Sequence, residues 1–597
     1  MERIPKRSEV KEENTWNLKD IFVSDEAWQA EYGALRAVPA EIEKKRGTLG
    51  ASARDLLAYF KEDDDLTVRI SKFYGYASQK SDEDTGNSVY QDMRSKALSV
   101  LVALRTASSF VVPEIIAIPG ETLERFMREE PALEAYKRPL YTMRRRKPHI
   151  LSDECEALLA SAGEITNAPE HICSTFIDAD LTFPDVTDDA GEAHPLTNET
   201  FVPLLMGPDR SLRKKTFETY YHTLGKYRNT IAAALDAQFK QLRFISAARK
   251  YPSTLEAALD GNEVPVAVYR NLIEAVHQNL PKMYRYVSLR KKLLGTEDLH
   301  MYDVYTPVVP DADAKIPFEQ AKKTVLEALA VLGEDYTSLL QKGFNGRWID
   351  VYENVGKRGG AYSSGNGYPN PYVLLNYTDL LDDMFTLAHE MGHALHSYHS
   401  CLKQLPCNAD YVIFVAEVAS TCNEVLLMRH LLKTTTDRKT RAYLINHFLD
   451  QFKGTVYRQT MFAEFEMQMG QLSEAGETLT ADLLCERYLA LNKMYFGPDM
   501  VSDDEIALEW ARIPHFFYDY YVFQYATGFS AAVAIADRIL KEGEPAVQDY
   551  KAFLSGGCST DPISLLKIAG VDMSSPAPVN AALSLFGSLV EELEKCF

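Results

Sequence analysis

Residues 380–399 read LLDDMFTLAHEMGHALHSYH and contain the motif HEMGH at 389–393. Apolar residues recur every three or four positions in this stretch, which predicts an amphipathic helix. Two histidines four residues apart lie on one face of a helix, within about one turn of rise, so both imidazoles can bind one tetrahedral metal ion. Glu390 is offset by about 100° around the axis and can reach a water molecule on that ion. The motif predicts a zinc site with His389 and His393 as ligands and Glu390 as general base.

The alternative is a buried histidine pair that neighbouring carboxylates satisfy, but it leaves the placement of Glu390 unexplained. A catalytic zinc also needs a third protein ligand and an open position. His399 follows His389 by ten residues, as in metzincins, but the position of their chain-turning glycine is His396, which continues the helix. His399 would lie about 15 Å along the axis from His389. We therefore interpret His396 as a residue that packs against the helix or supports a ligand, and exclude His399.

A better third ligand lies in residues 409–433, ADYVIFVAEVASTCNEVLLMRHLLK. This strongly apolar predicted helix has a narrow polar stripe at Glu417, Ser420, Thr421 and Glu424, which indicates a buried polar site. A buried carboxylate requires a metal or a cation, so Glu417 is the predicted third ligand. Glu424, two turns on, is predicted to accept the N–H of a ligand histidine. The reaction class is hydrolysis of an amide by a zinc-bound water that Glu390 activates.

A second informative segment is residues 513–530, IPHFFYDYYVFQYATGFS. Aromatic stripes are most often part of a core. Neutral phenols beside a histidine are also suitable donors to a tetrahedral oxyanion, which makes His515, Tyr518 and Tyr525 candidates. Tyr518 and Tyr525 are seven residues apart and can share one helical face.

Most of the remaining sequence has helical periodicity, which predicts a mainly α fold. Two segments interrupt it. Residues 181–196 pair two extended runs across an Asp-Asp-Ala-Gly turn and predict a hairpin. Residues 347–377 predict a small sheet and a glycine-rich loop directly before the zinc helix. We expect a helical region at 1–197, ending in the hairpin, and a catalytic region at 198–597, which pack as one enclosed fold.

Composition excludes several classes of protein. With 46% hydrophobic and 25% charged residues, the chain has the composition of a globular protein rather than a disordered one. The net charge of −21 argues against sequence-independent nucleic-acid binding, which needs a basic surface. Residues 1–18 lack the apolar core of a secretory signal, and no stretch is expected to span a membrane. Eight cysteines without a CxxC pair fit the reducing cytoplasm.

In the stretches around the predicted zinc site and the aromatic segment, the sequence resembles the thimet oligopeptidase and oligoendopeptidase F group of zinc metallopeptidases, most closely oligoendopeptidase F. The stretches that carry the resemblance follow one another through the catalytic half. They are GKRGGAYSSG (356–365), PYVLLNYTDLLDDMFTLAHEMGHALHSYHS (371–400), FVAEVASTCNE (414–424), RQTMFAEFE (458–466) and HFFYDYYVFQYATG (515–528).

The resemblance implies two helical lobes that enclose a deep channel, with the zinc helix at its floor and the small sheet beside it. It implies one zinc per chain and cleavage of short unfolded oligopeptides. His515, Tyr518 and Tyr525 would bind the substrate carbonyl or the oxyanion. The loop 359–364 and the strand 372–377 would border the substrate, the strand through backbone hydrogen bonds. The residues expected there are Gly359, Gly360, Tyr362, Leu375, Asn376 and Tyr377. The paired glycines depart from the family pattern, in which one bulkier or polar residue is expected, and this makes the loop more mobile.

Two other functions remain open from the sequence. A zinc carboxypeptidase or peptidyl-dipeptidase of similar fold would need a cation for the substrate carboxylate, and the sequence does not identify one. A peptide-binding protein without turnover would have lost the base or a ligand, and all four residues are present. The oligomeric state is left open.

Overall fold

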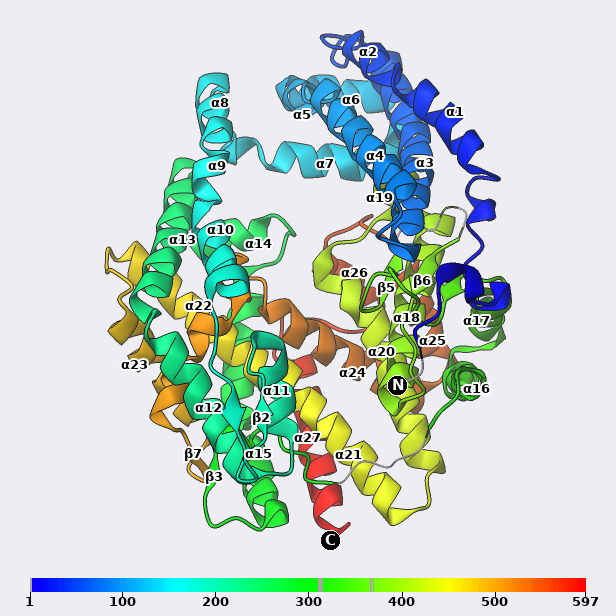
Figure 1. Cartoon of the computed structure of the whole chain (residues 1–597). Coiled ribbons are helices and arrows are strands. Elements are labelled where there is room, and N and C mark those ends of the chain that lie inside the picture. Colours follow the sequence, from blue (N-terminus) through cyan, green and yellow to red (C-terminus); the bar gives the residue numbers. More distant parts are fainter. Residues whose placement is uncertain (1–2, 310–314, 365–367, 369) are drawn as a thin grey trace. The chain divides into compact units, whose positions relative to one another are not determined.

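Helices form most of the chain, so the predicted mainly α class is confirmed (Figure 1). The computed structural model describes residues 3–309, 315–364, 368 and 370–597. The chain divides into two units, each assembled from three stretches of sequence. Unit 1 comprises residues 1–148, 314–430 and 535–571, and unit 2 comprises residues 149–313, 431–534 and 572–597. The division of the sequence near residue 197 and the channel between two lobes stay predictions.

Unit 1 holds the helix with the HEMGH motif and a three-stranded sheet. Its helices are α1 (Asp25–Leu35), α2 (Val38–Glu43), α3 (Ala53–Glu83), α4 (Ser88–Ala107), α5 (Val111–Ala117), α6 (Gly120–Glu129), α7 (Lys137–Arg145), α16 (Phe318–Leu329), α17 (Glu334–Asn345), α18 (Leu381–Lys403), α19 (Pro406–Ala409), α20 (Ile413–Thr434), α25 (Glu544–Leu554) and α26 (Pro562–Ile568). Its strands are β4 (Ile349–Asp350), β5 (Tyr362–Ser364) and β6 (Tyr372–Leu374).

Unit 2 is a helical assembly with two short pairs of strands. Its helices are α8 (Asp153–Ser161), α9 (Gly163–Thr166), α10 (Ala168–Thr175), α11 (Asn198–Met206), α12 (Arg210–Gly225), α13 (Arg228–Ala248), α14 (Thr254–Asp260), α15 (Val266–Leu294), α21 (Arg438–Phe452), α22 (Arg458–Glu474), α23 (Ala481–Phe496), α24 (Phe523–Glu542) and α27 (Ala577–Glu594). Its strands are β1 (Val186–Thr187), β2 (Ala193–His194), β3 (Leu299–His300) and β7 (Met500–Val501). The last turns of α20 lie in unit 2, and the second half of α24 lies in unit 1.

Both predicted interruptions of the helical pattern are confirmed as strands. β1 and β2 pair antiparallel, with Val186 opposite His194. In unit 1 the strand order is β4-β6-β5, in which β4 is parallel and β5 antiparallel to β6. α18 packs beside β5 and β6 (Figure 1). Within the glycine-rich stretch, residues 365–367 and 369 lie outside the described residues.

The N-terminal part of unit 1 has its own hydrophobic core. Trp28 stacks on Phe73 with ring centroids 4.5 Å apart and donates its indole N–H to the Phe73 carbonyl at 2.8 Å. Such buried aromatic pairs combine large apolar area with a satisfied polar group. This core joins α1 to α3. It also extends to the three-stranded sheet, because Tyr372 and Leu374 of β6 belong to the same cluster.

One segment, 88–117, is long and apolar enough to cross a membrane by length and composition alone. In the structure it is not a single helix, because α4 ends at Ala107 and α5 begins at Val111. Its inward-facing side chains, among them Met93 and Leu104, belong to the hydrophobic core of unit 1.

Candidate active site

The HEMGH motif lies on α18, as predicted. Asp383 caps the start of this helix: its carboxylate accepts the backbone N–H groups of Thr378 at 2.8 Å and Leu380 at 2.9 Å. A carboxylate in the first turn satisfies N–H groups that have no partner within the helix and stabilises the positive end of its dipole. The helix then continues without a break through His389 and His393.

Gly392, inside the motif, lets α18 and α20 approach each other closely. A Cβ added there would lie 2.6 Å from Ser420 Cα and 2.8 Å from Ala419 O, which no side chain tolerates. A hydrogen bond also joins the two helices: the side-chain amide of Asn423 on α20 donates to Ala388 O on α18 at 3.1 Å. The crossing brings the polar stripe of α20 against the two histidines of α18.

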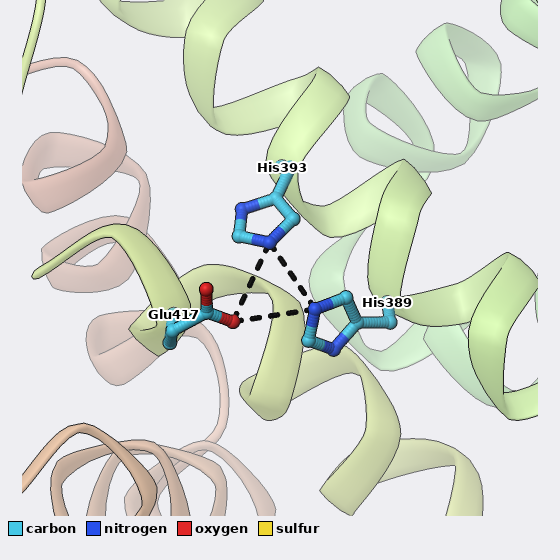
Figure 2. Close-up of side chains that lie close together, drawn as sticks. All are labelled: His389, His393 and Glu417. Carbon is cyan, nitrogen blue, oxygen red and sulfur yellow. Dashed lines mark hydrogen bonds and ion pairs between the residues drawn. The ribbon is translucent and has the colours of Figure 1, made fainter. Parts of the chain in front are cut away.

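The three predicted ligands meet at this crossing (Figure 2). Glu417 Oε2 lies 3.2 Å from His389 Nε2 and 3.5 Å from His393 Nε2. The two Nε2 atoms are 3.2 Å apart. Two imidazole nitrogens and a carboxylate oxygen therefore converge on one point, and one ligand atom from each residue is within 4.8 Å of the others.

Two further groups hold the Glu417 and His389 side chains. The Ser420 hydroxyl donates to Glu417 Oε2 at 3.2 Å. Glu424 contacts His389 Nδ1, so the other ring nitrogen, Nε2, faces Glu417. Burial opposes ionisation of Glu417, but hydrogen bonds from His389 and His393 outweigh it and hold its pKa well below the ordinary value. Glu417 is therefore an ionised carboxylate, the form that binds a metal ion.

Glu390 follows His389 directly on α18, and its carboxyl group is buried with one oxygen not bonded to any described residue. The residue is only 7% exposed, and its Oε2 has no hydrogen-bond partner among the described residues. Burial raises the pKa of the Glu390 carboxyl, partly offset by the charges of His389 and His393. A buried carboxyl without a protein partner is available to a bound water or substrate.

The other two histidines of α18 do not join the cluster. His396 is fully buried and stacks on Tyr411 with ring centroids 3.8 Å apart, and it also packs against Phe553. Neither of its ring nitrogens has a hydrogen-bond partner among the described residues, and burial lowers the pKa of His396 to about 3. His399 stacks on Tyr336 instead. His396 therefore packs as a neutral aromatic ring and does not touch a ligand.

The sheet beside α18 places the expected substrate residues differently from the sequence expectation. β6 is the middle strand, so the backbone of residues 372–374 is already paired on both sides and cannot bind a peptide. That part of the expectation is wrong. Leu375 and Tyr377 are buried, and their N–H groups donate to Asp350 O and Val351 O.

Side-chain hydrogen bonds hold the glycine-rich loop on both sides. Asn376 donates to Gly360 O at 2.8 Å and to Arg358 O at 3.0 Å. The Tyr362 hydroxyl donates to Asp82 Oδ2 at 2.7 Å. Gly360 has a left-handed backbone with φ of 80°, and both Gly359 and Gly360 are exposed. Asn376 and Tyr362 therefore shape the loop, and the two glycines form its exposed surface.

The predicted aromatic group lies in unit 2 and is assembled around His515. The ring centroid of His515 is 5.5 Å from that of Tyr518 and 6.0 Å from that of Tyr525. The Tyr525 hydroxyl is 3.5 Å from His515 Nε2. Tyr518 is 47% exposed. Burial, and then the charge of Arg458, lowers the pKa of His515, which favours the neutral imidazole.

The expectation that Tyr518 and Tyr525 share a helical face is wrong. A short 3-10 turn ends at Phe517 and α24 begins only at Phe523. Between them Asp519 and Tyr520 both have left-handed backbones, with φ of 56° and 60°. The turn, rather than a helix, returns Tyr525 to His515. Sequence reasoning missed both this turn and the role of Gly392; the glycine inside HEMGH was the available signal for the close helix crossing.

Comparisons with known proteins agree with this arrangement. The family "Peptidase family M3" matches residues 204–585, and the family "Oligopeptidase F" matches residues 114–183. The chain is 46% identical over 593 residues to "Oligopeptidase PepF" of Bacillus subtilis, which covers 99% of this chain and 88% of that protein. It is 40% identical over 590 residues to an "Oligoendopeptidase F homolog" of Lactococcus lactis, covering 99% and 98%.

Among solved structures, the chain is similar to oligoendopeptidase-F from Enterococcus faecium. The identity is 38% and the TM-score 0.74, and the match covers 96% of this chain and 99% of that one. The matched family covers well over half of the chain, and the matches cover 88% to 99% of the lengths of these relatives. The chain therefore belongs to peptidase family M3 and is a metalloendopeptidase.

Proposed function

We propose that the protein hydrolyses internal peptide bonds of short, unfolded oligopeptides, with one zinc ion held by His389, His393 and Glu417 and with Glu390 as general base. The observation that carries the proposal is the convergence of three ligand atoms beside a buried carboxyl, that of Glu390, whose Oε2 has no hydrogen-bond partner within the described part of the chain. The names of the relatives, oligopeptidase and oligoendopeptidase F, support the same substrate class.

The donor set suits zinc. Two neutral imidazoles and one carboxylate are the ligands of one class of catalytic zinc site, in which a fourth position stays open for water or substrate. A zinc ion bound there would act as a Lewis acid and would lower the pKa of water at the site. Glu424 supports this assignment, because a carboxylate on His389 Nδ1 keeps the lone pair of Nε2 directed at the ligand cluster.

In this proposal one residue transfers the protons, and others donate hydrogen bonds to the substrate. Glu390 accepts a proton from the attacking water, and the same carboxyl returns it to the leaving amine. Its burial and raised pKa suit a group that must change protonation state during turnover near neutral pH. In unit 2, the hydroxyls of Tyr518 and Tyr525, with His515, are proposed as neutral donors to the substrate carbonyl as negative charge develops on it.

An extended peptide is proposed to lie along β5. The outer side of β4 is bonded to the N-terminal segment, since Val351 N–H donates to Asn14 O and Asn17 N–H donates to Arg347 O. β5 is the other edge of this sheet and has no second strand partner among the described residues. An edge strand next to the metal helix can bind a peptide by main-chain hydrogen bonds. The exposed Gly359 and Gly360 would leave room for the substrate backbone.

Peptides with blocked ends test the proposal against its alternatives. We expect internal cleavage of a peptide that is acetylated at its N-terminus and amidated at its C-terminus, loss of cleavage with a chelator, and recovery on adding zinc. Mass spectrometry of the products locates each cut. Cleavage restricted to residues next to a free C-terminus would favour a carboxypeptidase or peptidyl-dipeptidase, and binding without cleavage would favour a peptide-binding protein. Residence in the cytoplasm is proposed as well, since none of the eight cysteines forms a disulfide.

A further inference from the structure

The turn at Asp519–Tyr520 is a strained segment that surrounding side chains must hold. Among the described residues these are the only two consecutive non-glycine residues with left-handed backbones. A left-handed conformation is unfavourable for a non-glycine residue, and such positions persist only where neighbouring contacts overdetermine them. The turn therefore depends on contacts outside itself.

Three helices of unit 2 supply these contacts. Gln238, on α13, donates to Asp519 Oδ1 at 2.9 Å and to Phe517 O at 3.3 Å. The Tyr520 hydroxyl is 2.7 Å from Thr254 Oγ1 at the start of α14. Glu466, on α22, accepts the backbone N–H of Tyr520 at 2.6 Å. Of these bonds, only the one to Glu466 satisfies a main-chain N–H within the left-handed pair.

Glu466 is an unusual partner for that N–H. It is 1% exposed, and its second oxygen, Oε2, has no hydrogen-bond partner among the described residues. Burial raises the pKa of the Glu466 carboxyl well above its ordinary value. A buried carboxyl with an oxygen that no described residue bonds is costly for stability, which points to a role other than stabilisation.

We propose that Glu466 is a positioning residue, which holds the left-handed turn through the Tyr520 N–H and thereby places Tyr518 and Tyr525 around His515. The turn lies between the two tyrosines in the sequence, so its backbone conformation determines how both rings approach the imidazole. This inference rests on the proposed function, in which these side chains bind the substrate carbonyl.

The first test compares two variants at position 466. Glu466→Gln keeps a carbonyl oxygen that can accept the Tyr520 N–H, and its amide nitrogen replaces an oxygen that has no partner. Glu466→Met removes the acceptor at similar volume. We expect kcat of Glu466→Met to fall about 10- to 100-fold, because the buried N–H loses its partner, with a much smaller change in KM. Glu466→Gln should restore kcat to within about threefold of the original enzyme. Both should retain one zinc per chain.

A second pair of variants perturbs the turn from the other side and does not depend on Glu466→Met folding. A Cβ at Gly470 would lie 1.9 Å from the Tyr520 hydroxyl, so this buried side chain, which is bonded to Thr254, would have to shift. Gly470→Ala should therefore lower kcat as Glu466→Met does. Gly454→Ala is the matched control, because a Cβ at Gly454 meets nothing within 4 Å. Hydrogen exchange of peptides covering 514–525 should rise in Gly470→Ala and stay unchanged in Gly454→Ala.

Several outcomes would overturn the inference. It is wrong if Glu466→Gln loses as much kcat as Glu466→Met, since a charge rather than an acceptor would then be needed. It is also wrong if Gly470→Ala lowers thermal stability alone and leaves kcat unchanged. Tyr525→Phe and Tyr518→Phe separate this failure from that of the proposed function: if neither tyrosine variant changes kcat, both proposals fail. If a tyrosine variant lowers kcat while Glu466→Met and Gly470→Ala do not, only the positioning role fails.

Discussion

Glu424 on α20 contacts Nδ1 of His389 on α18, and this contact directs His389 Nε2 toward Glu417 at 3.2 Å. The two carboxylates therefore hold opposite sides of one imidazole. A histidine whose ring is held from both sides in this way has a defined ring orientation before any metal binds.

Replacing Glu424 should weaken zinc binding without removing a ligand. We expect Glu424→Ala to lower zinc affinity about 10- to 100-fold, because the imidazole of His389 loses the group that orients it. Glu424→Gln keeps an oxygen acceptor and should lose less. Competition with a chromogenic chelator measures both affinities. Zinc affinity of Glu424→Ala equal to that of the original protein would contradict this role.

Glu390→Gln should separate metal binding from turnover. The amide cannot accept a proton, so kcat should fall about 10²- to 10⁴-fold, while the zinc content stays at one per chain. Asp382→Asn is a matched control, because Asp382 is exposed on the first turn of the same helix. Kinetics on a fluorogenic peptide, together with metal analysis, provide the measurement. Unchanged hydrolysis by Glu390→Gln would rule out the proposed base.

Gly392→Ala should force α18 and α20 apart. Its Cβ would meet the backbone of Ser420 at 2.6 Å, so we expect a loss of about 1–3 kcal/mol in stability together with weaker zinc binding. Gly33→Ala, on α1, is the control, because a Cβ there meets nothing within 4 Å and should stabilise the helix by up to about 1 kcal/mol. Thermal melting and zinc titration would test both. A Gly392→Ala protein that binds zinc normally and melts higher would refute the close crossing.

His396 should make the protein sensitive to acid. Its pKa is about 3 in the folded protein and 6.5 when unperturbed, so between these values the unfolded chain binds a proton that the folded one does not. Stability from this group is therefore complete above about pH 6.5 and falls as the pH drops, by about 2 kcal/mol at pH 5.

His396→Phe removes this titration while keeping an aromatic ring between Tyr411 and Phe553. We expect the variant to lose about 2 kcal/mol less stability than the original protein between pH 8 and pH 5. Denaturant unfolding at the two pH values, with chelator present throughout so that zinc release does not contribute, measures the difference. Equal losses in both proteins would show that His396 is not the responsible group.

The sequence was sufficient for features that depend on helical periodicity. The spacing of four between His389 and His393, and of seven between Glu417 and Glu424, defines which side chains share a face of α18 and of α20. These relationships are local, because a helix has the same geometry wherever it packs. The helical class could be predicted for the same reason, and the hairpin and the small sheet before α18 could be predicted because extended runs and turn residues are also local signals.

Tertiary structure alone decided how those local elements meet. The close approach at Gly392 depends on Ser420, in a different helix, and the middle position of β6 depends on β4 and β5 pairing with it from separate stretches. The left-handed turn at Asp519–Tyr520 is held by a buried acid more than fifty residues earlier, so helical spacing predicted the wrong conformation there. Periodicity indicates which face of a helix or strand is buried. Which groups that face contacts depends on residues distant in the chain, and these long-range contacts supply the free energy that overrides local preference.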